Sequence, residues 1–199
     1  MHVTVPCESS AEADRLEIWS EAAGLKLTRI ELARGRVPSQ VMITSVGAPT
    51  LATQAAEAER WVARLRSAGF GVARVKIEST LEAPEVPREP EAGGRYFEHH
   101  LKVVLDASVD LEALARRVIP HGAHLSRNAR RTRPDGRRER FVTQRCHGVG
   151  AAAASMALEA LLAELADLEI IEVEREYVLY DSDLSLDDGW IADVQEVAV

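Results

Sequence analysis

Two histidines in the second half of the chain lie among acidic and basic residues that could share proton-transfer chemistry. His100 belongs to a run in which Glu98 and Lys102 alternate with apolar residues, and His124 begins a similar run. Alternation with a period of two is typical of a β-strand, so these side chains are expected on one face of a sheet. Imidazoles beside carboxylates can divide the roles of general acid and general base. The candidate catalytic residues are therefore His100, His124, Glu98 and Glu176.

Other polar residues on the same predicted strands are expected to bind a negatively charged substrate. The expected substrate-binding residues are Lys102, Ser126, Arg127, Asn128, Arg137, Arg138 and Arg145. One strand is ambiguous, because either Gln144 or the pair Thr143 and Arg145 can join this face. The imidazoles and carboxylates could also bind a divalent metal, but no segment has the fixed spacing of a metal motif. The sequence therefore predicts neither a metal nor another cofactor, and a solvated sheet face is the alternative interpretation.

The basic residues of the chain are concentrated in one hairpin. Eight arginines lie between Arg127 and Arg145 against two acidic residues, although the whole chain has a net charge of −8. Pro134-Asp135-Gly136 predicts the turn, because proline presets φ and glycine accepts positive φ. Guanidinium groups bind phosphate through paired hydrogen bonds. The hairpin favours a nucleotide or RNA as the partner; a charged, solubilising hairpin, or one that docks on the acidic tail, is the alternative.

The elements that would position these residues form two similar halves. Each half is predicted as strand, helix, strand, strand, helix, strand, starting near residues 2–7 and 96–105. An offset of 98 residues aligns the halves and pairs His2 with His100 and Glu78 with Glu176. We therefore predict an α+β fold made by tandem duplication of a ferredoxin-like βαββαβ unit. It would contain two four-stranded antiparallel sheets, each with helices on one face.

The domain boundaries follow from composition. Residues 1–80 would form an N-terminal lobe, 81–94 a linker rich in Pro and Glu, 95–181 a C-terminal lobe carrying the site, and 182–199 an acidic tail. Regularly spaced prolines predict a solvated, extended linker. The N-terminal lobe is expected to be mainly structural, because its residues at the matching positions are Thr4, Lys26 and Thr28. Trp190 and Ile191 are expected to dock the tail on the body.

Composition limits the class of protein. Hydrophobic residues make up 46% of the chain, enough for a sizeable core, and no apolar run reaches the length of a membrane span. Two cysteines cannot form a disulfide framework. The N-terminus has no signal-peptide pattern. These features predict a cytoplasmic protein with no membrane partner.

Two short motifs, His2-Val3-Thr4 and His124-Leu125-Ser126, are similar to the His-x-Thr/Ser motifs of the 2H phosphoesterases. That family acts on phosphodiester bonds in RNA and nucleotides, and each of its two lobes contributes one motif to a shared cleft. Here the two motifs fall on strands that the 98-residue offset does not pair. This departure breaks the family's symmetry, so the chain is not assigned to it.

Three functions fit these features. The preferred one is binding or processing of a phosphate-bearing ligand, a nucleotide or RNA, on the C-terminal lobe. The second is a small-molecule enzyme or binding protein of the α+β barrel type, with a pocket between the two sheets. The third is a non-catalytic scaffold that forms a homo-oligomer.

Overall fold

The computed structural model describes residues 1–47, 50–130 and 133–191. Its strands are β1 (His2–Val5), β2 (Lys26–Leu32), β3 (Ser39–Thr44), β4 (Arg74–Ser79), β5 (Tyr96–Leu105), β6 (Ala123–Asn128), β7 (Arg138–His147) and β8 (Glu169–Asp181). Its α-helices are α1 (Ser10–Ala22), α2 (Leu51–Ser67), α3 (Leu111–Val118) and α4 (Ala151–Glu164). Two short 3-10 helices are η1 (Ile119–His121) and η2 (Leu184–Asp187).

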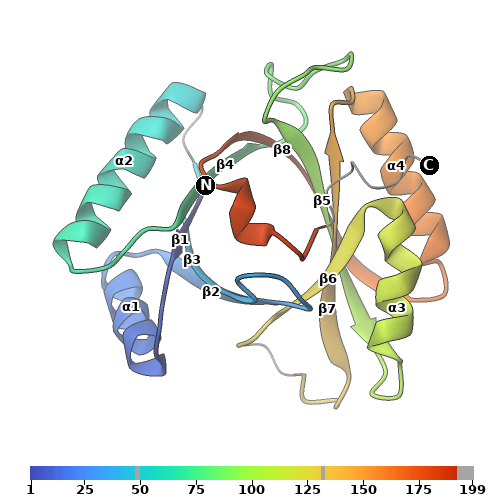
Figure 1. The fold of residues 1–199 in the computed structure, drawn as a ribbon, viewed down its shortest axis with the longest axis horizontal. Coiled ribbons are helices and arrows are strands. Elements are labelled where there is room, and N and C mark those ends of the chain that lie inside the picture. Colours follow the sequence, from blue (N-terminus) through green and yellow to red (C-terminus); the bar gives the residue numbers. More distant parts are fainter. Residues whose placement is uncertain (48–49, 131–132, 192–199) are drawn as a thin grey trace.

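The strands form one closed antiparallel barrel (Figure 1). Their order around it is β1-β3-β2-β6-β7-β5-β8-β4, and β4 pairs with β1 to close the ring. The two halves of the chain meet at two seams. At one seam β2 pairs with β6, where Glu31 lies opposite Arg127, and at the other β4 pairs with β8, where Lys76 lies opposite Asp181.

The predicted α+β fold of tandem ferredoxin-like units, each with its own open sheet, is wrong, because the eight strands form a single closed barrel. The physical reason lies at the edges of the sheets. A separate four-stranded sheet leaves unpaired N–H and C=O groups on its two outer strands. In the barrel the outer strands β2 and β4 pair with β6 and β8, so closure satisfies those groups. Element order along the chain carries no information about this pairing between distant segments.

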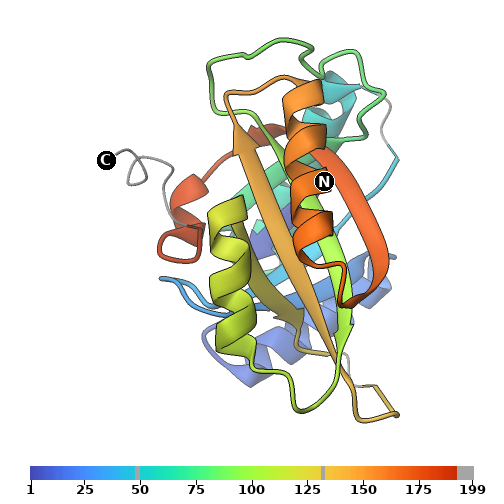
Figure 2. The same ribbon diagram turned by 90° about the vertical axis from the view of Figure 1, so that its right-hand side faces the viewer.

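Alternation along the strands sends apolar side chains outward and polar side chains inward. On β5, Leu101 and Val103 are fully buried in a core that also contains residues of α3 and α4. Glu98 and His100, on the opposite face of β5, line the interior of the barrel. Figure 2 shows α3 and α4 lying against the outer face of this half. The apolar cores therefore lie between barrel and helices, and the interior is polar.

Local sequence fixes where the covering helices begin. The Asp110 side chain accepts hydrogen bonds from the backbone N–H groups of Glu112 and Ala113 at the start of α3. Thr50 and Thr53 form a capping box at the start of α2. Such caps satisfy N–H groups that have no partner within a helix. No helix in residues 1–47, 50–130 and 133–191 is long and apolar enough to cross a membrane.

The predicted linker is partly packed against the barrel. Leu81 and Val86 contact the cluster of buried residues around Phe97, and the Pro87 carbonyl accepts a hydrogen bond from Ala151 at 2.9 Å. Four of its residues line the interior cavity: Glu82, Ala83, Pro84 and Glu85. The segment is thus part of the cavity boundary as well as a connection between halves.

Residues 182–191, named here the C-terminal plug, fold back into the barrel opening (Figure 1). Asp187 and Trp190 are only 3% and 5% exposed. The Trp190 indole Nε1 donates a hydrogen bond to the Leu125 carbonyl at 2.9 Å. The predicted docking by Trp190 is confirmed, and residues 192–199 of the predicted tail lie outside the described residues.

Candidate functional site inside the barrel

The barrel interior contains a cavity of about 1060 Å³ that opens to solvent. Asp187 and Trp190 of the C-terminal plug contribute to its lining, and exposed residues such as Val46 and Glu82 mark its mouth. The lining is rich in charge of both signs, with acidic groups in excess. Its charged residues are Glu57, Glu78, Glu82, Glu85, Glu98, Glu172, Glu174, Glu176 and Asp187, against Lys26, Arg74, Lys76, Lys102 and Arg145.

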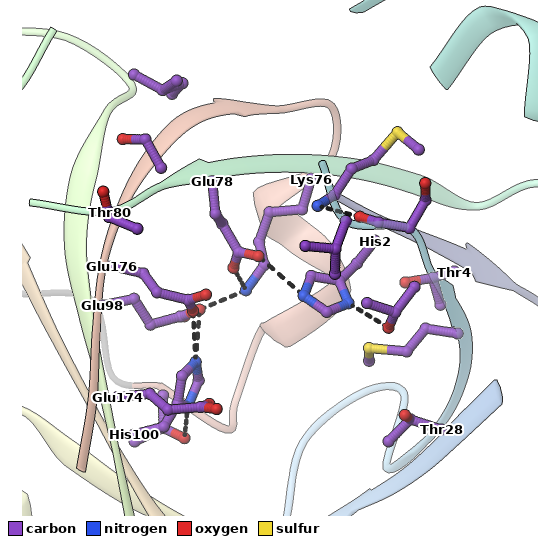
Figure 3. Close-up of a pocket in the computed structure, with 18 of the residues that line it drawn as sticks. His2, Thr4, Thr28, Lys76, Glu78, Thr80, Glu98, His100, Glu174 and Glu176 are labelled. Carbon is purple, nitrogen blue, oxygen red and sulfur yellow. Dashed lines mark hydrogen bonds and ion pairs between the residues drawn. The ribbon is translucent and has the colours of Figure 1, made fainter. Parts of the chain in front are cut away.

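In the first half, one histidine is held between a threonine and a glutamate (Figure 3). His2 Nδ1 lies 2.9 Å from Thr44 Oγ1, and His2 Nε2 lies 2.9 Å from Glu78 Oε2. His2 and Thr44 are opposite each other on β1 and β3, and Glu78 comes from β4, the other neighbour of β1. Three adjacent strands therefore position this first histidine group.

The second half builds a similar arrangement. His100 Nδ1 lies 2.9 Å from Thr143 Oγ1, and His100 Nε2 lies 3.5 Å from Glu176 Oε2. His100 is opposite Thr143 on β7, and Glu176 comes from β8, the other neighbour of β5. His100 Nε2 also lies 3.2 Å from Glu98 Oε2. We call His100, Thr143 and Glu176 the second histidine group.

Lys76 and Glu98 connect the two groups. Lys76 Nζ lies 2.6 Å from Glu78 Oε1 and also pairs with Glu98 Oε2. The other oxygen of Glu98 accepts a hydrogen bond from Arg145 Nε at 2.5 Å. Glu98 has no solvent exposure. Because a buried carboxylate is costly unless paired, these two cations are needed to keep it ionised in this position.

The C-terminal plug extends this network. Asp187 Oδ2 accepts hydrogen bonds from Arg74 Nη1 at 2.8 Å and from Arg145 Nη2 at 2.7 Å, and Asp187 Oδ1 accepts one from Gln40 at 2.8 Å. Arg74 also donates to Asp181, with 2.8 Å between Nε and Oδ1. The plug therefore contributes a buried carboxylate that neutralises part of the charge of two buried guanidinium groups.

The surroundings shift the pKa values of the carboxyl groups in opposite directions. Burial favours the neutral form of Glu98, but Lys76, Arg145 and His100 outweigh it and hold the pKa of Glu98 well below its usual range. For Glu176, burial and the nearby charge of Glu78 raise the pKa to about 7. One cavity thus contains a firmly ionised carboxylate and one that is close to half-protonated at neutral pH.

The structure brings together only part of the predicted site. Glu98, His100 and Glu176 converge in the cavity, and the lining also includes Lys102, Ser126, Asn128, Thr143 and Arg145. The ambiguity on β7 is thereby resolved, because Thr143 and Arg145 face the interior and Gln144 faces α4, where it hydrogen-bonds to the Ala157 carbonyl.

His124 does not pair with His100. It lies outside the cavity lining, under the C-terminal plug, with its ring 6.2 Å from that of Trp190 between centroids. Burial, together with the charges of Arg34 and Arg145, lowers the pKa of His124 to about 4. The predicted catalytic role of His124 therefore has no geometric support from the cavity.

The predicted hairpin arginines also lie away from the cavity. Arg127 forms an ion pair with Glu31 across the β2–β6 seam. Arg137 pairs with Asp135 at 3.0 Å and with Glu169 at 2.5 Å. Arg138 Nη2 donates to the Val109 carbonyl at 2.6 Å. The structure separates this basic surface from the histidine groups.

Sequence reasoning missed three residues of the first half: His2, Lys76 and Glu78. The expectation that the N-terminal lobe is mainly structural does not hold for the cavity, because these residues form part of its ionised wall. The 98-residue offset pairs His2 with His100 and Glu78 with Glu176, and could have identified two of them. Lys76 has no such signal, because the residue 98 positions later is Glu174.

No protein-family model matches the chain, and a search of curated proteins also finds no match. Function must therefore be inferred from the cavity itself, its size, its charges and the side chains that meet in its wall.

Proposed function

We propose that the protein binds a small molecule inside the barrel. The observation that carries this proposal is the convergence of the two histidine groups, Lys76 and Glu98 on the wall of one cavity of about 1060 Å³. Small-molecule sites are typically concave spaces of ~300–1000 Å³ with a few converging polar groups. Burying so many ionisable groups is costly for stability. Binding of a ligand would explain why the chain retains these buried ionisable groups.

The charges of the cavity favour a ligand that is positively charged or rich in hydrogen-bond donors. Among the residues that the structure describes, nine acidic and five basic ones line the cavity. Arg74, Lys76 and Arg145 are already paired with buried carboxylates, and Lys102 Nζ lies 3.4 Å from Glu172. A free phosphate would meet an excess of negative charge, whereas a cation would be attracted by it.

A cavity-filling variant tests this proposal. Thr28 lines the cavity and points into it (Figure 3), so Thr28→Trp should block binding. The matched control is Ile18→Trp on α1, where the side chain is 69% exposed. Spermidine, arginine and choline serve as cationic probes, glucose as a neutral one, and citrate as an anionic one. Binding is measured by calorimetry and by amide chemical shifts.

We expect at least one cationic probe to bind the parent chain and the Ile18→Trp variant, and to lose binding in Thr28→Trp. Shifts should concentrate on the inward-facing residues of β1, β4, β5 and β8. Preference for citrate over every cation, or equal binding by both variants, contradicts the proposal.

A phosphate-bearing ligand on the arginine hairpin is the second candidate. The observation in its favour is that Arg138 and Arg140 donate to backbone carbonyl groups, so these guanidinium charges remain available to an anion. This candidate predicts binding to RNA that weakens steeply with salt. Replacing Arg138 and Arg140 by serine should abolish that binding, and unchanged binding would exclude the hairpin as the site.

A further inference from the structure

Four side chains in the cavity bring metal-binding atoms close together. One oxygen from each of Glu78, Glu98 and Glu176 and one ring nitrogen of His100 lie within 4.8 Å of one another. They come from β4, β8 and β5, which are consecutive around the barrel (Figure 3). Three carboxylates this close repel one another unless a cation lies among them.

His100 is oriented for metal binding by its other ring nitrogen. Nδ1 is 2.9 Å from Thr143 Oγ1, so Nε2 faces the carboxylates, 3.2 Å from Glu98 Oε2. Histidine ligands in proteins almost always hydrogen-bond through the nitrogen that does not bind the metal. The geometry of the second histidine group therefore matches that of a preorganised ligand.

Glu78 supplies a further independent observation. Its Oε2 is 2.9 Å from His2, whereas its Oε1 is buried and accepts no hydrogen bond within the described residues. Lys76 Nζ lies 2.6 Å from that Oε1, close enough for an ion pair but not aligned as a hydrogen bond. A buried oxygen with only an electrostatic contact is suited to coordinate a metal ion.

Lys76 now supplies the positive charge of the cluster. Its Nζ contacts Glu78 Oε1 and Glu98 Oε2, two of the atoms that a metal would need. A lysine ammonium is a compact charge on a flexible chain, and the adjoining cavity gives that chain room to move. A metal ion and the Lys76 ammonium would therefore compete for one position.

We propose that the cluster is a divalent-metal site in which the ion replaces the Lys76 ammonium among Glu78, Glu98, His100 and Glu176. Three oxygens and one imidazole favour Mn²⁺, Fe²⁺ or Zn²⁺ over the purely oxygen-coordinated Mg²⁺ and Ca²⁺. The inference deepens the proposed function and rests on it for its place in the same cavity. A bound ion would offset the charge of this cluster, and carboxylates outside it, such as Glu172 and Glu174, would remain in the lining for a cationic ligand.

Metal titration without any organic ligand tests the site. The full chain, freed of metals with EDTA and carrying no affinity tag, is titrated with Mn²⁺ by calorimetry and electron paramagnetic resonance, and then with Zn²⁺. We expect one ion per chain. Glu176→Gln and His100→Phe should weaken binding by about tenfold or more. Lys76→Met should strengthen it by about tenfold, because it removes the competing charge.

Glu174→Gln is the matched control, because it removes a carboxylate from the same cavity lining but from outside the four ligands, and it should leave the affinity within about threefold. Circular dichroism verifies that each variant is folded. Failure of both the parent chain and Lys76→Met to bind either ion overturns the inference, as does unchanged binding by Glu176→Gln and His100→Phe. If the metal fails to bind but the cationic probes still bind, the proposed function stands without a metal. If a metal ion binds but none of the cationic probes does, the metal site stands and the proposed function fails.

Discussion

The two histidine groups share a local geometry but differ in the charge of one neighbouring residue. In each, Nδ1 of the histidine faces a threonine on the neighbouring strand, and Nε2 faces a glutamate from the last strand of that half. The difference lies two residues before the glutamate. Lys76 precedes Glu78, whereas Glu174 precedes Glu176.

At the first of these positions, Lys76 is the strongest charge acting on the glutamate that follows it. Burial raises the pKa of Glu78, but Lys76 and then His2 outweigh it and hold the pKa well below its usual range. Glu176 has no lysine two residues before it, and burial and Glu78 raise its pKa to about 7. Strand geometry therefore sets which side chains meet, and the neighbouring charge sets which of them keeps its proton.

The largest expected effect concerns Arg145 on β7, which binds a buried carboxylate of β5 and one of the C-terminal plug. Arg145→Met removes one cation from each of two buried carboxylates, so that Glu98 keeps Lys76 and Asp187 keeps Arg74. Breaking a buried ion pair on one side typically costs about 3–5 kcal/mol. We expect a loss of that size in the free energy of unfolding, measured in urea. The control Arg137→Met, whose ion pairs are on the surface, should lose far less; equal losses would show that the buried network is not stabilising.

A second expected effect separates His124 from the histidines of the two groups. The pKa of His124 is lowered to about 4 by burial and by the cations Arg34 and Arg145, with Trp190 packed beside it. Between that value and the ordinary pKa of ~6.5 the unfolded chain binds more protons than the folded one. Stability should therefore fall as pH decreases from about 7 to 4, with a contribution from His124 of roughly 3 kcal/mol.

Unfolding in urea at pH 7 and at pH 4.5 measures this contribution as a difference between the parent chain and His124→Gln. The parent should lose more stability on acidification than the variant does. His121→Gln, at a partly exposed histidine in η1, is the control and should behave like the parent. If the His124 variant loses as much stability as the parent, the acid sensitivity comes from other groups.

A third, smaller effect would make the second histidine group resemble the first. Glu174→Lys places an ammonium two residues before Glu176, as Lys76 lies before Glu78. The pKa of Glu176 should fall from about 7 by one unit or more, because a nearby opposite charge favours the ionised form. The pKa of Glu176 is measured by carbon NMR of EDTA-treated protein with labelled glutamate, and the Glu176→Gln variant identifies the signal of this residue. Glu159→Lys, on the exposed face of α4, should cause no change; if Glu174→Lys causes none either, position 174 does not control Glu176.

The sequence was sufficient to group residues that are neighbours on one strand. Glu98, His100 and Lys102 were expected on one face of a strand, and all three line the cavity, because alternation is a local property of β-structure. Trp190 was expected to dock the tail, and it does. On β5, polar residues on one face of an otherwise apolar strand thus identified the interior.

Interactions between distant segments could not be predicted in this way. Barrel closure depends on backbone pairing of β2 with β6 and of β4 with β8, which no side-chain pattern specifies. His124 carries the same alternation signal as His100, but the C-terminal plug covers it. The role of Lys76 depends on Glu98, which reaches it only after the two halves have joined.

The smallest expected effect tests whether the two halves are equivalent in their local structure. Ser9 caps α1 by accepting a hydrogen bond from Glu12 at 3.2 Å, and Asp110 caps α3 by accepting from Glu112 at 2.9 Å and from Ala113 at 3.2 Å. Ser9→Ala and Asp110→Ala should each cost about 1 kcal/mol, because loss of an N-cap acts within one helical turn. Thermal unfolding measures both, and Asp110→Asn should retain most of the stability. Similar losses of stability in Ser9→Ala and Asp110→Ala would mean that the two halves differ in the barrel interior, at Lys76 and Glu174. A much larger loss in one variant would mean that the helix of that half also supports the cavity.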